Sequence, residues 1–271
     1  MSALVRTVLG DVPAGSLGVV DSHDHLFLAT PALPGQELGG LAADDLRAFA
    51  AAGGTTLVQW TPRGMRRGLG LLPELAIGTG VAVVAATGRH RAVHSRDVPT
   101  EDLAERFVDD VVARRCGLIK IGVGLPFDTF ERASLAAAAV AHRQTGAPVA
   151  IHLEDGRGGR AVLDELGIAP EAVVLGHVGR HPDPRSAARL AATGAFVCLD
   201  GPRPGATWAA RPVLDAIVEA GHVAQILLGG DTTTRAGVGS AARMLDLVDP
   251  RTPLGRAVLV DNPARAWRIR T

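Results

Sequence analysis

Short apolar runs alternate with longer, Ala-rich segments along most of the chain. Each apolar run follows a glycine, as in TTLVQW after Gly54, VAVVAATG after Gly80 and LIKIGVG after Gly117. A glycine directly after a helix supplies the left-handed residue that closes the last turn. Continuous apolar runs are typical of strands buried on both faces of a parallel sheet. The pattern therefore predicts helices and parallel strands in alternation.

Eight strands are expected. The first is the run GVVDSH at residues 18–23, and seven more follow Gly54, Gly80, Gly117, Gly146, Gly167, Gly194 and Gly221. Helices fit between them, for instance over Asp44–Ala52, Glu101–Arg115, Glu131–Thr145 and Pro184–Thr193. Eight alternations favour a closed (β/α)₈ barrel, the TIM barrel, over an open doubly wound sheet. Residues 1–17 are expected to form an N-terminal β-hairpin. No linker-like segment interrupts the pattern, so we predict a single domain over residues 1–271.

Composition narrows the function classes. Hydrophobic residues make up 47% of the 271 residues and charged residues 21%, which allows a large core. The formal net charge is zero, so neither a nucleic acid nor a membrane surface is an expected partner. We find neither a signal-peptide pattern nor a run of ~20 apolar residues, and we expect a cytoplasmic protein. Cys116 and Cys198 are expected to be buried, reduced thiols.

Polar residues stand where the predicted strands end, and these ends meet at one face of a barrel. They are His23, His25, Lys120, His152, His177 and Asp231. The spacing of His23 and His25 puts both imidazoles on one side of a strand, where they can converge on one ion. Imidazole and carboxylate ligands suit Zn²⁺ or Mn²⁺.

Each of these residues also has a purely structural interpretation. The His-x-His could be a hydrogen-bonded pair at the barrel rim, and His152 and His177 could be satisfied structural histidines. Asp231 could cap the following helix. Their joint occurrence at the same end of four strands favours a metal site.

Lys120 is the only lysine among 28 basic residues, and it interrupts the strand LIKIG. An unpaired buried ammonium is costly, and burial near cations favours the neutral amine. A neutral amine can add CO₂ to become a carbamate whose two oxygens bridge two metal ions, which arginine cannot do. The alternative is a buried pair between Lys120 and a carboxylate.

The motifs GVVDSHDHL, AATGRHR, GLIKIGVG, TGAPVAIH, VVLGHVG, ILLGGD and DNPAR resemble the amidohydrolase superfamily, and within it the phosphotriesterase-like branch. The resemblance implies that His23, His25 and Asp231 hold one ion, that His152 and His177 hold a second, and that carboxylated Lys120 bridges them. It implies two divalent ions, zinc in the first place with manganese, cobalt or iron as alternatives. It also implies a metal-bridging hydroxide that attacks a carbonyl, with Asp231 as general base and then acid, and it allows a homodimer.

The chain departs from that branch at three points. Asp21 precedes the His-x-His, as in the wider superfamily, and Asp200-Gly201 stands where organophosphate-cleaving members carry Asp-His. The chain has no tyrosine, so the pocket tyrosine of the lactonases has no counterpart. We predict a lactonase or esterase that acts on a small molecule, with an anionic or sugar-derived lactone as the leading substrate class.

Candidate substrate contacts follow the strands. They are Trp60, Arg63, His90, Arg91, Arg203 and Arg235. Guanidinium groups match carboxylate and phosphate, although an arginine-rich chain also scatters arginine over solvated loops. Other functions stay open: a phosphoester, phosphotriester or amide hydrolase of the same superfamily, a TatD-like metal-dependent DNase, or a catalytically silent metal-binding barrel.

Overall fold

The computed structural model describes residues 3–201 and 210–270 and contains an eight-stranded parallel barrel after an antiparallel hairpin. The hairpin strands are β1 (Leu4–Thr7) and β2 (Gly10–Pro13). The barrel strands are β3 (Val20–Asp24), β4 (Thr56–Gln59), β5 (Ala82–Arg89), β6 (Leu118–Val123), β7 (Val149–Leu153), β8 (Val173–Gly176), β9 (Phe196–Asp200) and β10 (Ile226–Gly229). They pair in chain order from β3 to β10. The predicted barrel and hairpin are confirmed.

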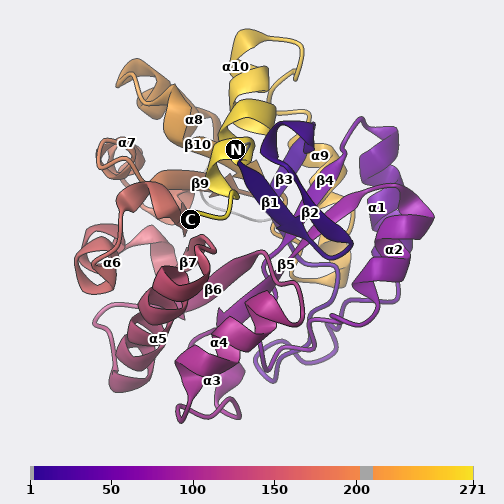
Figure 1. Ribbon diagram of the computed structural model, residues 1–271. Helices are drawn as coiled ribbons and strands as arrows, with labels where there is room; N and C mark the ends of the chain where they lie inside the picture. The colour runs from indigo at the N-terminus through magenta and orange to yellow at the C-terminus, as the bar shows by residue number, and fades with distance from the viewer. Residues whose placement is uncertain (1–2, 202–209, 271) are drawn as a thin grey trace.

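Helices surround the strands (Figure 1). They are α1 (Ala42–Ala51), α2 (Leu72–Thr79), α3 (Ala92–Ser95), α4 (Leu103–Val112), α5 (Thr129–Thr145), α6 (Gly159–Leu166), α7 (Arg185–Ala191), α8 (Ala210–Glu219), α9 (Ser240–Met244), α10 (Pro253–Arg256) and α11 (Asn262–Ala266). The four predicted helices appear as α1, α4, α5 and α7, with ends shifted by at most three residues. Helix α5 begins two residues early because Asp128 forms a capping box with Glu131.

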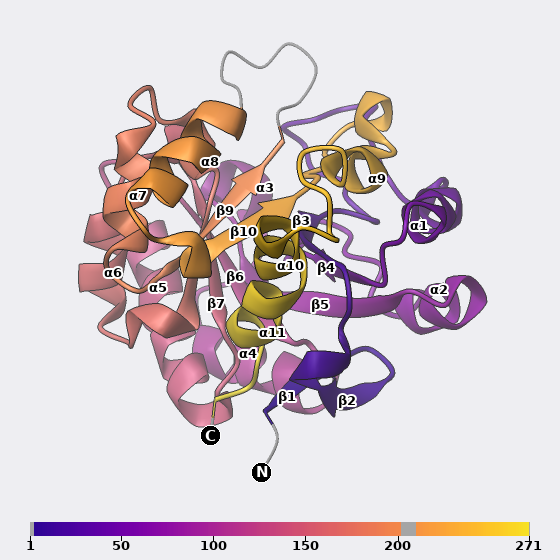
Figure 2. The same ribbon diagram turned by 90° about the horizontal axis from the view of Figure 1, so that it is seen from above.

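The hairpin and both ends of the chain lie together at one end of the barrel (Figure 2). Val5 of β1 forms an antiparallel bridge with Arg268, and Ile269 donates its backbone N–H to the carbonyl of Leu4 over 2.8 Å. Val8, which follows β1, donates to the carbonyl of Val83 near the start of β5. The hairpin therefore covers the amino ends of the strands and leaves the carboxyl ends to the opposite face.

Side chains that point into the barrel interior include the polar residues near the carboxyl ends of the strands. Buried apolar residues such as Leu118, Ala150 and Cys198 belong to one inner cluster. Strand side chains alternate between faces, so the residue two positions later also points inward. On β6 that residue is Lys120 and on β7 it is His152. The same two-residue repeat thus places an apolar layer inside the barrel and a polar layer next to it, nearer the carboxyl ends of the strands.

The structure also bears on the two cysteines and on membrane-spanning helices. Cys116 and Cys198 are free and buried, and burial raises the pKa of the Cys116 thiol to about 12. Within the described ranges, no helix combines the length and the apolar character needed to cross a bilayer. The assignment of residues 1–271 to one domain stays a prediction.

Candidate metal centre

Three of the predicted residues converge at the carboxyl ends of β3 and β10. Nε2 of His23 lies 3.6 Å from Oδ1 of Asp231, and Nε2 of His25 lies 3.7 Å from the same oxygen. One ligand atom from each of the three side chains lies within 4.8 Å of the others. All three residues are buried. Two imidazole nitrogens and a carboxylate oxygen therefore face a common point.

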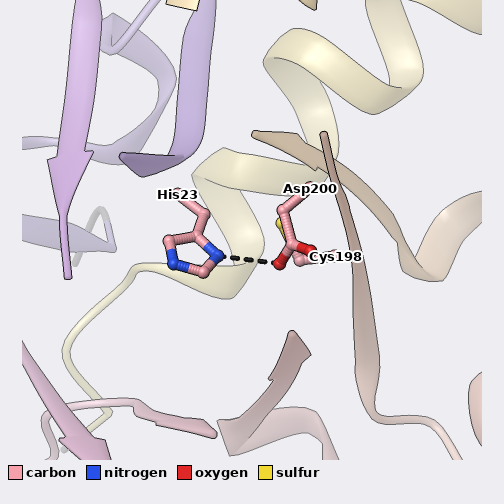
Figure 3. A group of neighbouring side chains, drawn as sticks. All are labelled: His23, Cys198 and Asp200. Atoms are coloured by element: carbon pink, nitrogen blue, oxygen red, sulfur yellow. Dashed lines mark hydrogen bonds and ion pairs between the residues drawn. The ribbon is translucent and has the colours of Figure 1, made fainter. Parts of the chain in front are cut away.

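The Nδ1 atom of each imidazole, opposite the nitrogen that faces Asp231, contacts a polar side chain. Nδ1 of His23 lies 2.8 Å from Oδ2 of Asp200, and Nδ1 of His25 lies 2.7 Å from Oγ1 of Thr61. Figure 3 shows the His23–Asp200 pair, with Cys198 beside the carboxylate. Such outer partners orient a histidine so that its free nitrogen can bind a metal. Trp60 adds a face-on contact, because its indole stacks 3.7 Å from the His23 ring.

A second pair of nitrogens faces each other on β7 and after β8. Nδ1 of His152 and Nε2 of His177 are 2.7 Å apart. Burial lowers the pKa of both imidazoles, which favours the neutral, metal-binding form. Nδ1 of His177 contacts Oδ1 of Asp200 over 2.7 Å, so this carboxylate supports both His23 and His177. The two imidazoles hold the pKa of Asp200 well below its usual range, although burial acts in the opposite direction.

Lys120 is buried and only 1% exposed. It lines one cavity together with His152, His177 and Asp231. Burial lowers the pKa of Lys120 to about 7, against the attraction of Asp231 and Glu154. A large fraction of this amine is therefore neutral near neutral pH, as the carbamate hypothesis requires.

Two of the predicted ligands have an unusual backbone. His177 has φ of 62° and Asp231 has φ of 48°, in the left-handed region that residues with a β-carbon seldom adopt. Such strain persists where the surrounding structure holds it, and it is common at functional sites. Both residues stand just after a barrel strand, His177 after β8 and Asp231 shortly after β10.

The cavity has a volume of about 190 Å³. Leu28, Leu33 and Met65 form its apolar wall, and further polar residues are His90, His94, Glu154, Arg180 and Thr233. Glu154 accepts from Arg91 over 2.8 Å and lies 3.1 Å from Nε2 of His152. Arg180 donates to Oδ2 of Asp231 over 3.2 Å. Sequence reasoning missed both residues, although Glu154 stands two positions after His152 and Arg180 three after His177.

The predicted substrate contacts divide into several groups. His90 lines the cavity, and its Nδ1 accepts the backbone N–H of Arg91. The Arg91 guanidinium reaches the site indirectly, through its ion pairs with Glu131 and Glu154. Arg235 is exposed and lines an adjoining cavity of about 290 Å³ to which His25 also contributes. Arg203 lies outside the described residues.

Two of these predictions do not fit the structure. Trp60 is fully buried under His23, and its indole N–H donates to the carbonyl of Ser22 over 2.8 Å, so it does not form a pocket wall. Arg63 turns away from the cavity and pairs with the buried Asp110 over 2.5 Å. Burying a charged carboxylate is costly without a partner, and Arg63 supplies a cation to Asp110.

The donor set fits divalent metal ions. Neutral imidazoles and a carboxylate are typical ligands of zinc and similar ions, and four of the imidazole nitrogens point inward while their partners hold the opposite side.

Comparison with known proteins places this geometry in a family. The model of the phosphotriesterase family matches residues 3–242. A phospho-furanose lactonase of Mycoplasmopsis agalactiae is 30% identical over 234 residues, 73% of this chain. An N-acetyltaurine hydrolase of Danio rerio is 29% identical over 228 residues, 65% of this chain. The matched segments span 66% and 65% of these relatives, just under two thirds of their length.

Solved structures support the fold. A lactonase from Listeria monocytogenes superimposes with a TM-score of 0.88 at 24% identity, covering 99% of this chain and all of that one. A mutant organophosphorus hydrolase from Deinococcus radiodurans superimposes with a TM-score of 0.82 at 22% identity, covering 98% of this chain and 97% of that one. At these identities the likeness concerns the barrel alone.

Proposed function

This chain belongs to the phosphotriesterase family, and from that premise we propose that it is a hydrolase that works with two divalent metal ions and cleaves small lactones or carboxylic esters. The observation that carries the proposal is the convergence of His23 Nε2, His25 Nε2 and Asp231 Oδ1 beside the buried amine of Lys120.

The proposed ligand sets follow the two groups of side chains. His23, His25 and Asp231 would hold one ion, and His152 with His177 would hold the other. Lys120 would bridge them after its neutral amine adds to CO₂, a step that forms the N–C bond and releases one proton. Its low pKa supports this step, because only the unprotonated amine can react.

The ions, zinc in the first place, would make water acidic enough to attack at neutral pH and would polarise the scissile carbonyl. The chain itself would handle the proton. The Asp231 carboxylate would accept a proton from the attacking water and return it to the leaving oxygen. Arg180, which donates to Asp231 Oδ2 over 3.2 Å, would orient that carboxylate.

The size and charge of the cavity and the substrates named for two relatives support a small anionic substrate. A phospho-furanose lactone and N-acetyltaurine are both small molecules with an anionic group. A cavity of about 190 Å³ also suits a small substrate. Arg180 in the cavity and Arg235 beside it are the cations that would attract such an anion. Because one relative is an N-acetyltaurine hydrolase, an amide hydrolase is the second candidate.

Metal analysis coupled to a substrate panel tests the proposal. The panel pairs lactones, esters and N-acyl amines with and without a phosphate, sulfonate or carboxylate. We expect two equivalents of metal per chain and hydrolysis that favours the anionic member of a lactone pair. Lys120→Ala should lose metal and activity, and short-chain carboxylic acids should restore part of both.

Arg180→Ala should raise KM for anionic substrates more than for neutral ones. Arg160→Ala, the same change at an exposed site outside the cavity, is its control. Fewer than two metal equivalents in the reconstituted protein, or no hydrolysis of any member of the panel, would contradict the proposal.

A further inference from the structure

The seam of the barrel runs between β3 and β10. Strand pairing proceeds in chain order and leaves these two strands at the ends of the sheet. Among the described residues, one backbone hydrogen bond crosses the seam, from the N–H of Asp231 to the carbonyl of His23 over 2.8 Å. His23 and His25 stand on one side and Asp231 on the other. The relative position of the two strand ends therefore sets the distance between the proposed ligands of one ion.

Two buried carboxyl groups join the strand ends beside these ligands. Oδ1 of Asp21 accepts the backbone N–H of His23 over 2.9 Å and that of Gly230 over 3.2 Å. Oδ1 of Asp24 accepts the backbone N–H of His25 over 2.7 Å and that of Thr232 over 2.7 Å. Each carboxyl group thus binds one amide from each side of the seam.

Both carboxyl groups are enclosed by protein. Asp21 is 0% exposed and Asp24 is 1% exposed. Oδ2 of Asp24 is buried and accepts no N–H or hydroxyl donor among the described residues. A β-carbon at position 230 would lie 2.5 Å from that oxygen, so Gly230 is what lets the two strand ends approach.

We propose that Asp21 and Asp24 are positioning residues that replace a strand ladder across the β3–β10 seam and hold His23, His25 and Asp231 in register. The inference rests on the proposed metal function. A side-chain carboxyl group can accept one amide from each of two strand ends that do not pair with each other. A backbone carbonyl within a strand points towards one neighbouring strand and cannot join both strand ends in this way. Together the two carboxyl groups order four amides, those of His23 and His25 and those of Gly230 and Thr232, the two neighbours of Asp231.

Amide hydrogen exchange in the metal-free protein and Co²⁺ titration of the full chain test the proposal. Asp24→Ala removes the acceptor, whereas Asp24→Asn keeps an oxygen that can accept both amides. We expect Asp24→Ala to speed exchange of the Thr232 amide about 10-fold or more, the loss of one buried hydrogen bond. It should weaken Co²⁺ binding about 10- to 100-fold, as for other partners that orient a ligand. Asp24→Asn should stay close to wild type in both measurements.

Asp110→Asn is the matched control, because Asp110 is an equally buried carboxylate that pairs with Arg63 and Arg67 on the outer side of the barrel. It should leave Thr232 exchange and Co²⁺ affinity unchanged. The proposal is overturned if Asp24→Ala alters neither measurement, or if Asp24→Asn is as damaging as Asp24→Ala. If wild-type protein binds no Co²⁺, the proposed function fails, while the exchange experiment still decides whether the carboxyl groups hold the seam.

Discussion

Replacing Lys120 with methionine should make the metal-free protein more stable at neutral pH. The side chain is 1% exposed and its pKa falls from 10.5 to about 7. Methionine has a similar length, carries no charge and adapts to irregular spaces. The substitution therefore removes a group that costs folding free energy without leaving a large void.

The magnitude follows from the difference in pKa between the two states. Between pH 7 and 10.5 the unfolded chain protonates Lys120 while the folded chain does not, so stability falls as the pH is lowered across this range. The penalty is fully developed below pH 7. At 1.36 kcal/mol for each pKa unit, a change from 10.5 to about 7 amounts to about 4–5 kcal/mol.

Urea unfolding in CO₂-free buffer with a chelator, at several pH values from 6 to 10.5, measures the effect. We expect Lys120→Met to unfold at higher urea than wild type at pH 7 and the difference to vanish near pH 10.5. With metal present the order should reverse, because only the wild type gains the binding free energy of both ions. A variant that is less stable than wild type at pH 7, or a gain that does not depend on pH, would refute the reasoning.

Two further predictions concern other buried carboxyl groups. Burial raises the pKa of Asp45 from 3.8 to about 6. Between these pH values the group ionises in the unfolded chain but not in the folded one, so the free energy of unfolding falls as the pH rises. Asp45→Asn, whose amide oxygen can still accept the Gly239 N–H, should be about 3 kcal/mol more stable than wild type at pH 7 and equal near pH 4 in thermal unfolding. Asp200→Ala releases Nδ1 of both His23 and His177, so Co²⁺ titration should show both sites weakened about 10- to 100-fold; weakening of only one site would contradict the shared role of Asp200.

Much of the fold was predictable because its signals are local. A glycine after each helix and a continuous apolar run for each strand mark the alternation without reference to distant residues. The positions of Lys120 and His152 followed from the same source, since each is a polar residue that follows apolar residues of a predicted strand. Helix ends were less accurate because capping depends on individual side chains such as Asp128.

Two of the predicted substrate contacts, Arg63 and Trp60, instead contact residues far away in the sequence. Arg63 pairs with Asp110, which lies 47 positions further along the chain, and Trp60 packs against His23, 37 positions before it. Neither partner can be recognised from spacing, because helices and strands far apart in sequence bring them together. Arg180 and Glu154 were overlooked for the same reason: their roles depend on Asp231 and Arg91 being across the cavity.

The amino-acid sequence alone determined the barrel, the face at which its polar residues gather, and the six side chains proposed to bind metal. These depend on periodicity along the chain and on the rule that parallel strands end together. Only the tertiary structure decided which groups hold those side chains in place: Asp200 behind two histidines, Trp60 beneath one, and the Asp21–Asp24 pair across the seam. Such supports are contacts between distant elements, and their geometry exists only once the barrel has closed.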